Sequence, residues 1–235
     1  MRAGILQPGY LPWLGFFEQL DQTDCFVLLD DVQYDKNGWR NRNRIKTAQG
    51  PLWLTIPVHV PSGTLIKDVR IDNQTKWQRA HLESIVQNYS RTQYFSEFRE
   101  IFSEVYSKRW EFLADLDEHL IRQLSSILGL KQKRIIRSSE LLEGKGHVLD
   151  RTDRLLEICS RLGAQEFYEG ASGKQYLDVD TFERKGVRVR FQDYRHPSYP
   201  QLYGDFIPYL SVVDLIFNQG AKSLEVIRKG VGEAL

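Results

Sequence analysis

The sequence predicts an α/β fold with a mostly parallel sheet, helices on both of its faces and a helical insertion. Short apolar runs typical of buried strands alternate with amphipathic helical segments near the amino terminus, and the alternation resumes after residue 129. Residues from about 73 to 129 have a helical pattern throughout. Because no internal repeat and no long linker interrupts the chain, we expect one domain over residues 1–235, elaborated by this helical block.

The amino-terminal unit is predicted to be a strand, a loop, a helix and a second strand. Residues 3–6 form the apolar run AGIL and residues 25–29 the run CFVLL, both typical of buried strands. Residues 13–20 between them place Trp13 and Phe17 on one helical face. A unit of this length fits a parallel crossover.

The later elements are predicted from the same periodicity and from capping residues. Strands are expected at 53–58, with 65–71 as a candidate partner, and at 134–136, 166–168 and 187–191. Helices are expected at 74–89, 96–106, 110–128, 152–162 and 212–218. Asn73 and Ser211 are candidate N-caps, and Gly129 and Gly163 are candidate C-caps.

The charge balance argues against partners that need a strong overall field. Lys and Arg number 32 against 31 for Asp and Glu, a net charge of +1, so we expect no nucleic-acid partner. We find no targeting segment and no run that would span a membrane, and therefore expect a cytoplasmic protein. Cys25 and Cys159 lie far apart in apolar patterns.

The loop QPGYLPW follows the first predicted strand, where parallel sheets bind ligands. Pro8 and Pro12 stiffen it, and Gly9 permits a close approach of the backbone. Gln7 and Tyr10 are therefore candidate ligand-binding residues on a rigid loop. The alternative is a helix-entry turn whose aromatic side chains pack on the core.

A second candidate stretch follows the strand ending in Asp30-Asp31. Adjacent residues at a strand end face opposite ways, and we favour Asp31 as the carboxylate that faces a cleft. Cations and a tryptophan interleave between 35 and 46, a composition that can hold phosphate or carboxylate and stack on a ring. The candidate binding residues here are Gln33, Lys36, Trp39, Asn41 and Arg42. A solvated hairpin face is the alternative.

Two further stretches carry candidate residues. Lys174 ends the turn GASGK, which lacks the spacing of a P-loop but could hold an anion. In the carboxyl-terminal loop, His196 is the candidate general base. Asp31 or Asp214 is the candidate catalytic carboxylate that orients His196 or the substrate. Asp214 could instead belong to the start of its helix as in a capping box. Additional candidate binding residues are Tyr199, Gln201 and Asn218.

Several common sites have no counterpart in the sequence. There is no HExxH, no Cys/His cluster with metal-ligand spacing, no G-x-S-x-G and no G-x-G-x-x-G after the first strand. We therefore expect no metal site, no serine-hydrolase chemistry and no required cofactor.

Five segments together resemble one family, the WbqC-like proteins of bacterial surface-polysaccharide gene clusters. The segments are QPGYLPWLGFF, FVLLDDVQYDKNGWRNRNRIK, WLTIPV, YEGASGKQYL and YRHPSYPQLYGDFIPYLSVVDLIFNQG. The resemblance implies a transferase of O-antigen synthesis. Our hypothesis is transfer of an acyl or aminoacyl group, with glycyl as one candidate, to the amine of a nucleotide-linked amino sugar. The donor is not identified; an acyl-carrier protein or a coenzyme A thioester would serve.

The opening also looks like that of nucleotidyltransferase-type folds, whose first loop carries an H-x-G-H motif. Aligned on Gly15, those histidines fall at Trp13 and Phe16, so the usual adenylation chemistry would be absent. A nucleotidyltransferase-like enzyme acting on a sugar phosphate or acyl substrate and a non-catalytic nucleotide-sugar binding module remain alternatives.

Overall fold

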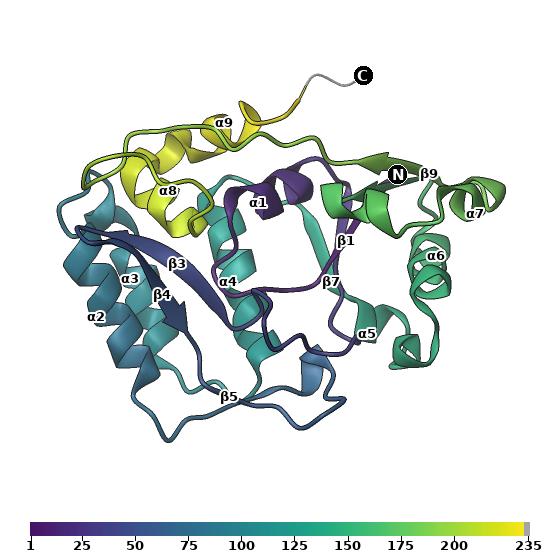
Figure 1. Ribbon diagram of the computed structural model, residues 1–235, viewed down its shortest axis with the longest axis horizontal. Helices are drawn as coiled ribbons and strands as arrows, with labels where there is room; N and C mark the ends of the chain where they lie inside the picture. The colour runs from purple at the N-terminus through teal and green to yellow at the C-terminus, as the bar shows by residue number, and fades with distance from the viewer. Residues whose placement is uncertain (233–235) are drawn as a thin grey trace.

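The computed structural model describes residues 1–232 and is built around a five-stranded parallel sheet (Figure 1). The strands lie in the order β7 (Arg134–Arg137), β2 (Cys25–Leu28), β1 (Arg2–Leu6), β8 (Glu166–Glu169) and β9 (Arg188–Phe191). The central strand β1 pairs in parallel with β2 and with β8, so that Gly4 lies opposite both Phe26 and Tyr168. The predicted parallel α/β architecture is confirmed.

Helices cover both faces of the sheet, because successive side chains of each strand point to opposite sides. Ala3, Ile5 and Val27 pack in one apolar cluster, whereas Phe26 and Leu28 pack in a second, larger one. The larger cluster is covered by α1 (Leu14–Asp21), α4 (Leu113–Ile127), α8 (Val212–Gln219) and α9 (Ser223–Arg228). The smaller cluster is covered by α5 (Ser138–Leu141), α6 (Arg151–Leu162) and α7 (Val179–Arg184).

A second layer extends the larger cluster away from the sheet. It contains the hairpin β3 (Arg42–Thr47) and β4 (Gly50–Thr55), the pair β5 (Val58–His59) and β6 (Arg70–Ile71), and the helices α2 (Trp77–Tyr89) and α3 (Phe95–Ser107). Figure 1 shows α2 and α3 beside this hairpin, at the opposite end of the molecule from α6 and α7. Short 3₁₀ turns lie at Ile66–Asp68, Gly146–Val148, Ala171–Gln175 and Gly220–Lys222.

Three capping predictions are confirmed and one is wrong. Gly129 follows the C-cap residue of α4 with φ +79°, and its amide donates to the Ser126 carbonyl at 3.1 Å. Gly163 ends α6 with φ +66°, and the Ser211 side chain accepts from the Val213 amide at the start of α8. Asn73, however, is not a cap: α2 begins at Trp77, and Asn73 Nδ2 donates to the carbonyl of Trp110 at 2.8 Å.

The hairpin and the start of α4 also differ from the prediction. The expected strand at 53–58 pairs only as far as Thr55, because the amide of Ile56 donates to Asn41 O at the hairpin end and the chain then enters β5. Its partner is β3 and not residues 65–71, of which only Arg70–Ile71 form a strand, paired with β5. The charged stretch after Asp31 therefore contains a hairpin strand, as its alternative interpretation had it. Helix α4 begins at Leu113, since the Leu113 amide donates to Val69 O outside the helix.

Candidate functional site

The carboxyl ends of β1 and β8 lie where the chain turns to opposite faces of the sheet. β1 leads into α1, which packs in the larger cluster, while β8 leads to α7, whose Phe182 packs in the smaller one. The loops after these two neighbouring strands therefore diverge. In open parallel sheets, ligands bind at this kind of topological switch point.

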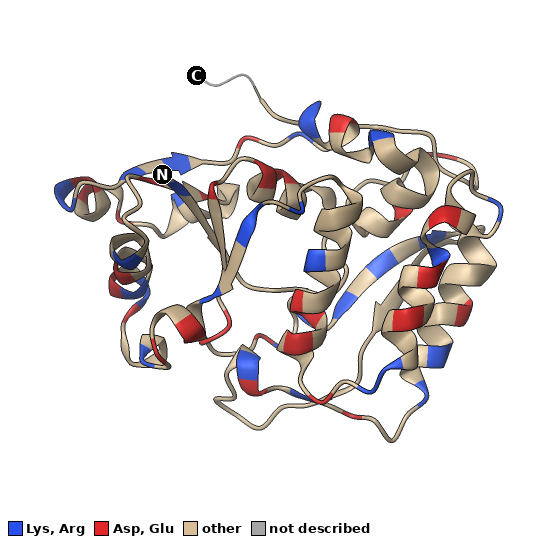
Figure 2. Ribbon diagram, turned by 180° about the vertical axis from the view of Figure 1, so that it is seen from behind, with Lys and Arg blue, Asp and Glu red and all other residues tan. Residues whose placement is uncertain are grey.

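A polar cavity of about 440 Å³ lies at the switch point. Its charged and polar lining includes Gln7, Arg40, Arg151, Arg154, Glu169 and Ser172. Arginines outnumber carboxylates in this lining. Figure 2 shows Lys and Arg beside Asp and Glu on most helices, whereas strand β3 carries Lys and Arg without Asp or Glu. The excess of positive charge is thus local, and a site of this kind favours an anion.

Arg40 is the charged group of the polar cavity with the fewest interactions. Its Nε and Nη1 are buried and have no hydrogen-bond partner within residues 1–232. Burial lowers the pKa of the guanidinium, and the carboxyls of Asp117 and Asp35 act in the opposite direction. An arginine stays charged at any ordinary pH. Buried donors without partners cost free energy, and an anion in the cavity would supply the acceptors that these two nitrogens lack.

Glu169 is the carboxyl group of the polar cavity and ends strand β8. It is 5% exposed, and the hydroxyl of Tyr176 donates to its Oε1 at 2.9 Å. Burial raises the pKa of Glu169 to about 7, against the lowering effects of the Tyr176 hydrogen bond and of Arg151. Gly173 leaves room for this side chain, because a Cβ there would lie 2.2 Å from Glu169 Cγ. The group can exchange a proton near neutral pH.

Helix α6 supplies the other two arginines of the polar cavity. Arg154 donates from Nε to the carbonyl of Gly146 at 2.6 Å and from Nη2 to that of Leu149 at 2.7 Å, which fixes the preceding turn. Arg151 lies over the ring of Tyr176, with Cζ 4.5 Å from the ring centroid. Tyr176 is therefore held between Arg151 and Glu169.

An aromatic cavity of about 520 Å³ adjoins the polar one. Its rings belong to Trp13, Phe16, Trp39 and Tyr209. Leu6, Gln7 and Arg40 line both cavities. The two cavities therefore meet beside the end of β1, one suited to stacking on a ring and the other to holding an anion.

The first loop is held in place by the segment before β3. The Tyr10 amide donates to Arg40 O at 3.0 Å, and a Cβ at Gly9 would lie 2.9 Å from Trp39 O, so only glycine permits this approach. Leu11 has φ +45°, and Asn43 Nδ2 donates to its carbonyl at 2.7 Å. This bracing positions Gln7 and Arg40 together.

The model of the WbqC-like protein family matches residues 7–226. The chain belongs to the WbqC-like protein family. It is 36% identical over 233 residues to an uncharacterized protein of Mycobacterium tuberculosis, Rv1507c, and the alignment covers 97% of each chain. No solved structure matches. The matched range includes Gln7, Arg40 and Glu169.

Three separate stretches of this WbqC-like chain that carry candidate residues meet at the aromatic cavity. The first loop contributes Gln7 and Trp13, the stretch after Asp31 contributes Trp39, and the carboxyl-terminal segment contributes Tyr209. Gln33 lines the polar cavity. The binding roles of Gln7, Gln33 and Trp39 stay predictions, made more specific by these positions.

Tyr10, the second candidate ligand-binding residue of the first loop, lines neither cavity, so its predicted binding role is wrong for the structure described. It has no exposed surface, and its hydroxyl contacts His81 Nδ1 at 2.8 Å and the hydroxyl of Tyr106. Burial lowers the pKa of His81 to about 4, which keeps the imidazole neutral in this cluster. For Tyr10, the alternative of an aromatic residue packing on the core is the correct one.

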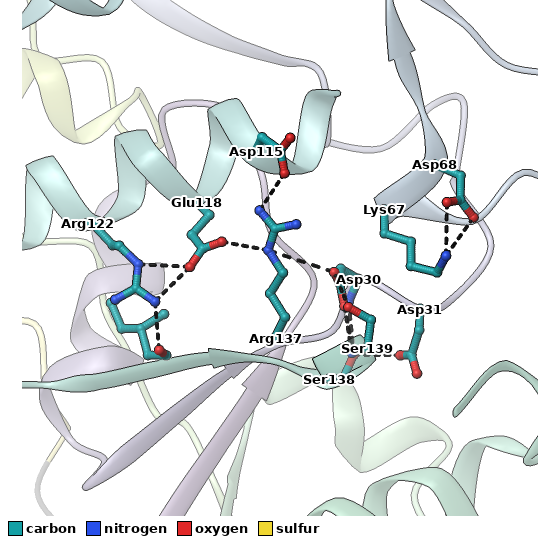
Figure 3. A network of polar contacts seen from close by, with 11 residues as sticks. Asp30, Asp31, Lys67, Asp68, Asp115, Glu118, Arg122, Arg137, Ser138 and Ser139 are labelled. Atoms are coloured by element: carbon teal, nitrogen blue, oxygen red, sulfur yellow. Dashed lines mark hydrogen bonds and ion pairs between the residues drawn. The ribbon is translucent and has the colours of Figure 1, made fainter. Parts of the chain in front are cut away.

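Asp31 faces a structural network instead of a cavity (Figure 3). The Ser138 hydroxyl donates to Asp31 Oδ1 at 2.5 Å, while the amide and hydroxyl of Ser139 donate to Asp30 at 3.0 and 2.8 Å. Both aspartates are fully buried and line neither cavity. They therefore attach the end of β2 to the end of β7, where Arg137 also pairs with Glu118.

Asp214 does not orient His196, which corrects the sequence-based hypothesis. Its Oδ1 accepts from the Tyr89 hydroxyl at 2.9 Å, and its Oδ2 accepts from Tyr199 at 2.9 Å and Gln201 at 2.8 Å. Burial raises the pKa of Asp214, and these three hydrogen bonds oppose the shift. Tyr199 and Gln201 are thus occupied by Asp214 and tie the carboxyl-terminal segment to α2.

His196 lies behind the aromatic cavity. Its Nδ1 donates to Pro197 O at 3.0 Å, so Nε2 carries the lone pair, yet Nε2 is buried and unpaired within residues 1–232. The ring stacks on Trp13 with centroids 6.3 Å apart, and burial lowers its pKa. A neutral imidazole has the right charge for a base, but Trp13 or His196 would have to move for Nε2 to meet a ligand. Its catalytic role stays a prediction.

The remaining candidates lie outside the two cavities. Asn41 Nδ2 donates to Ile56 O and Asn218 Nδ2 to Asp214 O, both structural roles. Arg42 lies over the Trp53 ring at 4.9 Å, and Lys36 is exposed. Lys174 lies 5.8 Å from the Phe191 ring centroid and lines a different cavity.

Sequence reasoning missed Arg151, Arg154 and Glu169 and did not single out Arg40. Glu169 follows the run Glu166-Phe167-Tyr168, so its place at the end of a predicted parallel strand was a usable signal. Arg151 and Arg154 belong to the first turn of α6, which lies at the same edge of the sheet as Glu169. No local sequence pattern shows that this helix turn and the end of β8 lie close together. Within residues 1–232, no group of three or more His, Cys, Asp or Glu could hold a metal ion, and no helix is long and apolar enough to cross a membrane.

Proposed function

We propose that this WbqC-like protein is a transferase that moves an acyl or aminoacyl group to the amine of a nucleotide-linked amino sugar. The observation that carries the proposal is the position of Arg40, which lines both the aromatic and the polar cavity and whose Nε and Nη1 are buried without a hydrogen-bond partner in residues 1–232. A nucleotide-linked sugar has the matching chemistry, because a diphosphate separates its two ring systems.

In this arrangement the diphosphate lies against Arg40 at the junction, within reach of the arginines of α6. One ring occupies the aromatic cavity beside Trp39, which is 44% exposed and can stack. The other ring enters the polar cavity, where Gln7 offers both a hydrogen-bond donor and an acceptor to sugar substituents. The acyl donor, a thioester of a carrier protein or of coenzyme A, would approach the amine from solvent.

The first test measures binding to UDP-, dTDP- and GDP-linked amino sugars by calorimetry and thermal shift. Ligand at 100 times its dissociation constant should stabilise the protein by about 2.7 kcal/mol. Arg40→Met should weaken binding by roughly ten- to a hundredfold, the effect of losing a charge-assisted hydrogen bond. Arg188→Met is the matched control, because Arg188 is exposed at the opposite, amino-terminal end of the strands.

Mass spectrometry of the bound sugar after incubation with thioester donors then tests for transfer. An added acyl mass on the sugar supports the proposal. Binding without product under every donor would instead indicate a binding module, and turnover of ATP or CTP with release of pyrophosphate a nucleotidyltransferase-like enzyme. Equal affinity of the wild type and Arg40→Met for the sugar nucleotides would overturn the assignment of Arg40.

A further inference from the structure

The polar cavity contains a carboxyl group at a place where its arginines attract anions. Glu169 and Arg40 line the same cavity, and Arg151 reaches it from α6. An anion drawn in by the arginines lies next to Glu169. If Glu169 were ionised, the two negative charges would repel at low local dielectric, and the repulsion would offset part of the attraction.

Protonation of Glu169 removes this conflict and adds a contact. A protonated carboxyl has an O–H that can donate to a phosphate oxygen, while its other oxygen keeps the hydrogen bond from Tyr176. We propose that the polar cavity binds its anionic ligand together with one proton, which is held by Glu169. The inference rests on the proposed function only in taking the ligand's phosphate as this anion.

The groups around Glu169 support an uptake of this proton near neutral pH. In the empty cavity, burial already raises the pKa of Glu169 to about 7, although the charge of Arg151 lowers it. The other titratable neighbours do not compete for the proton. The pKa of Cys159 in α6 is raised to about 12, chiefly by burial, and that of Tyr176 to about 12 as well, so both stay neutral. Arg40 and Arg154 stay charged.

Binding linked to one proton has a definite pH dependence. Below pH 7, Glu169 is already protonated and the affinity for the anion is constant. Above it, the affinity should fall by up to about tenfold for each pH unit, because a proton must be taken up. The free protein releases this proton as pH rises, whereas the ligand-bound protein retains it.

Inorganic sulfate is a suitable probe, because its charge is constant across this range. Sulfate is titrated into the full chain between about pH 6 and about pH 9, and binding is followed by NMR shifts of the amides of residues 170–176, next to Glu169. The wild type should lose roughly tenfold in affinity per unit at the upper end. Glu169→Gln, an isosteric neutral side chain, should bind with the low-pH affinity at every pH. Glu183→Gln, an exposed residue of α7, should behave as the wild type.

A second variant shifts the effect without removing it. The Tyr176 hydrogen bond lowers the pKa of Glu169, so Tyr176→Phe should move the onset of the loss of affinity to higher pH. A pH-independent wild type, or a pH dependence that persists in Glu169→Gln, would overturn the proposal, and so would the absence of any sulfate response in these amides. Proton-linked sulfate binding without binding of any sugar nucleotide would refute the proposed function alone. Sugar-nucleotide binding without proton linkage would refute this inference alone.

Discussion

Two buried charged regions of this chain differ in how their polar atoms are paired. Around Asp214, each carboxylate oxygen accepts at least one hydrogen bond, from Tyr89 on one side and from Tyr199 and Gln201 on the other. Around Arg40, two guanidinium nitrogens are buried with no partner in residues 1–232. Burial of polar atoms is thus compensated by hydrogen bonds in the first region and left uncompensated in the second, where the proposed anionic ligand would supply the missing acceptors.

The largest expected effect is on the paired region. Asp214→Ala removes the common acceptor of the Tyr89 and Tyr199 hydroxyls and of the Gln201 amide, and both buried hydroxyls lose the acceptor of their proton. We expect a loss of roughly 3–5 kcal/mol in the free energy of unfolding, measured by urea denaturation. Asp205→Ala, at an exposed position of the same segment, should change stability by less than about 0.5 kcal/mol. Equal stability of the Asp214 variant and the wild type would show that the hydrogen bonds around Asp214 do not stabilise the fold, and the contrast with Arg40 would then fail.

The unpaired region should respond with the opposite sign. Arg40→Met replaces a buried, partnerless cation with an apolar chain of similar length, so we expect the ligand-free protein to gain roughly 1–2 kcal/mol in unfolding free energy. Asp117 opposes this gain only in part, since burial raises the pKa of its carboxyl well above the usual value and so weakens its attraction to Arg40. Thermal and urea unfolding measure the change. A destabilised Arg40→Met would mean that Arg40 has a structural role.

The smallest expected effect is that of a substitution in the first loop, which should change the stability of the protein but not its ligand affinity. Tyr10→Phe removes the hydroxyl that contacts His81 and Tyr106, at a cost of about 1 kcal/mol, and leaves both cavities unchanged. Unfolding free energy and ligand affinity are measured together, and only the former should change. Weaker ligand binding by this variant at unchanged stability would instead support a ligand-binding role for Tyr10.

Sequence patterns predicted the order of the strands, loops and helices around the site better than they predicted which polar side chains line it. The order of strand, loop, helix and strand before residue 29 follows from local periodicity, and the place of QPGYLPW at a strand end follows from that order. The polar residues were harder to assign. Asp31 and Asp214 carry the side chains that acid–base chemistry uses, but distant elements bond to both. Ser138 donates to Asp31 Oδ1, whose Oδ2 packs against Gly146 without a hydrogen-bond partner in residues 1–232, and Tyr89 donates to Asp214.

The sequence by itself determined the parallel α/β order, the caps at Gly163 and Ser211, and the stiff first loop, because each depends on residues close together in the chain. The tertiary structure alone decided which charges meet. It brought Arg40, Arg151 and Glu169 to one cavity from three separate elements and left Arg40 unpaired while Asp214 was paired. Burial and pairing set the pKa and the free energy of a charged group, and both depend on neighbours that no local pattern specifies.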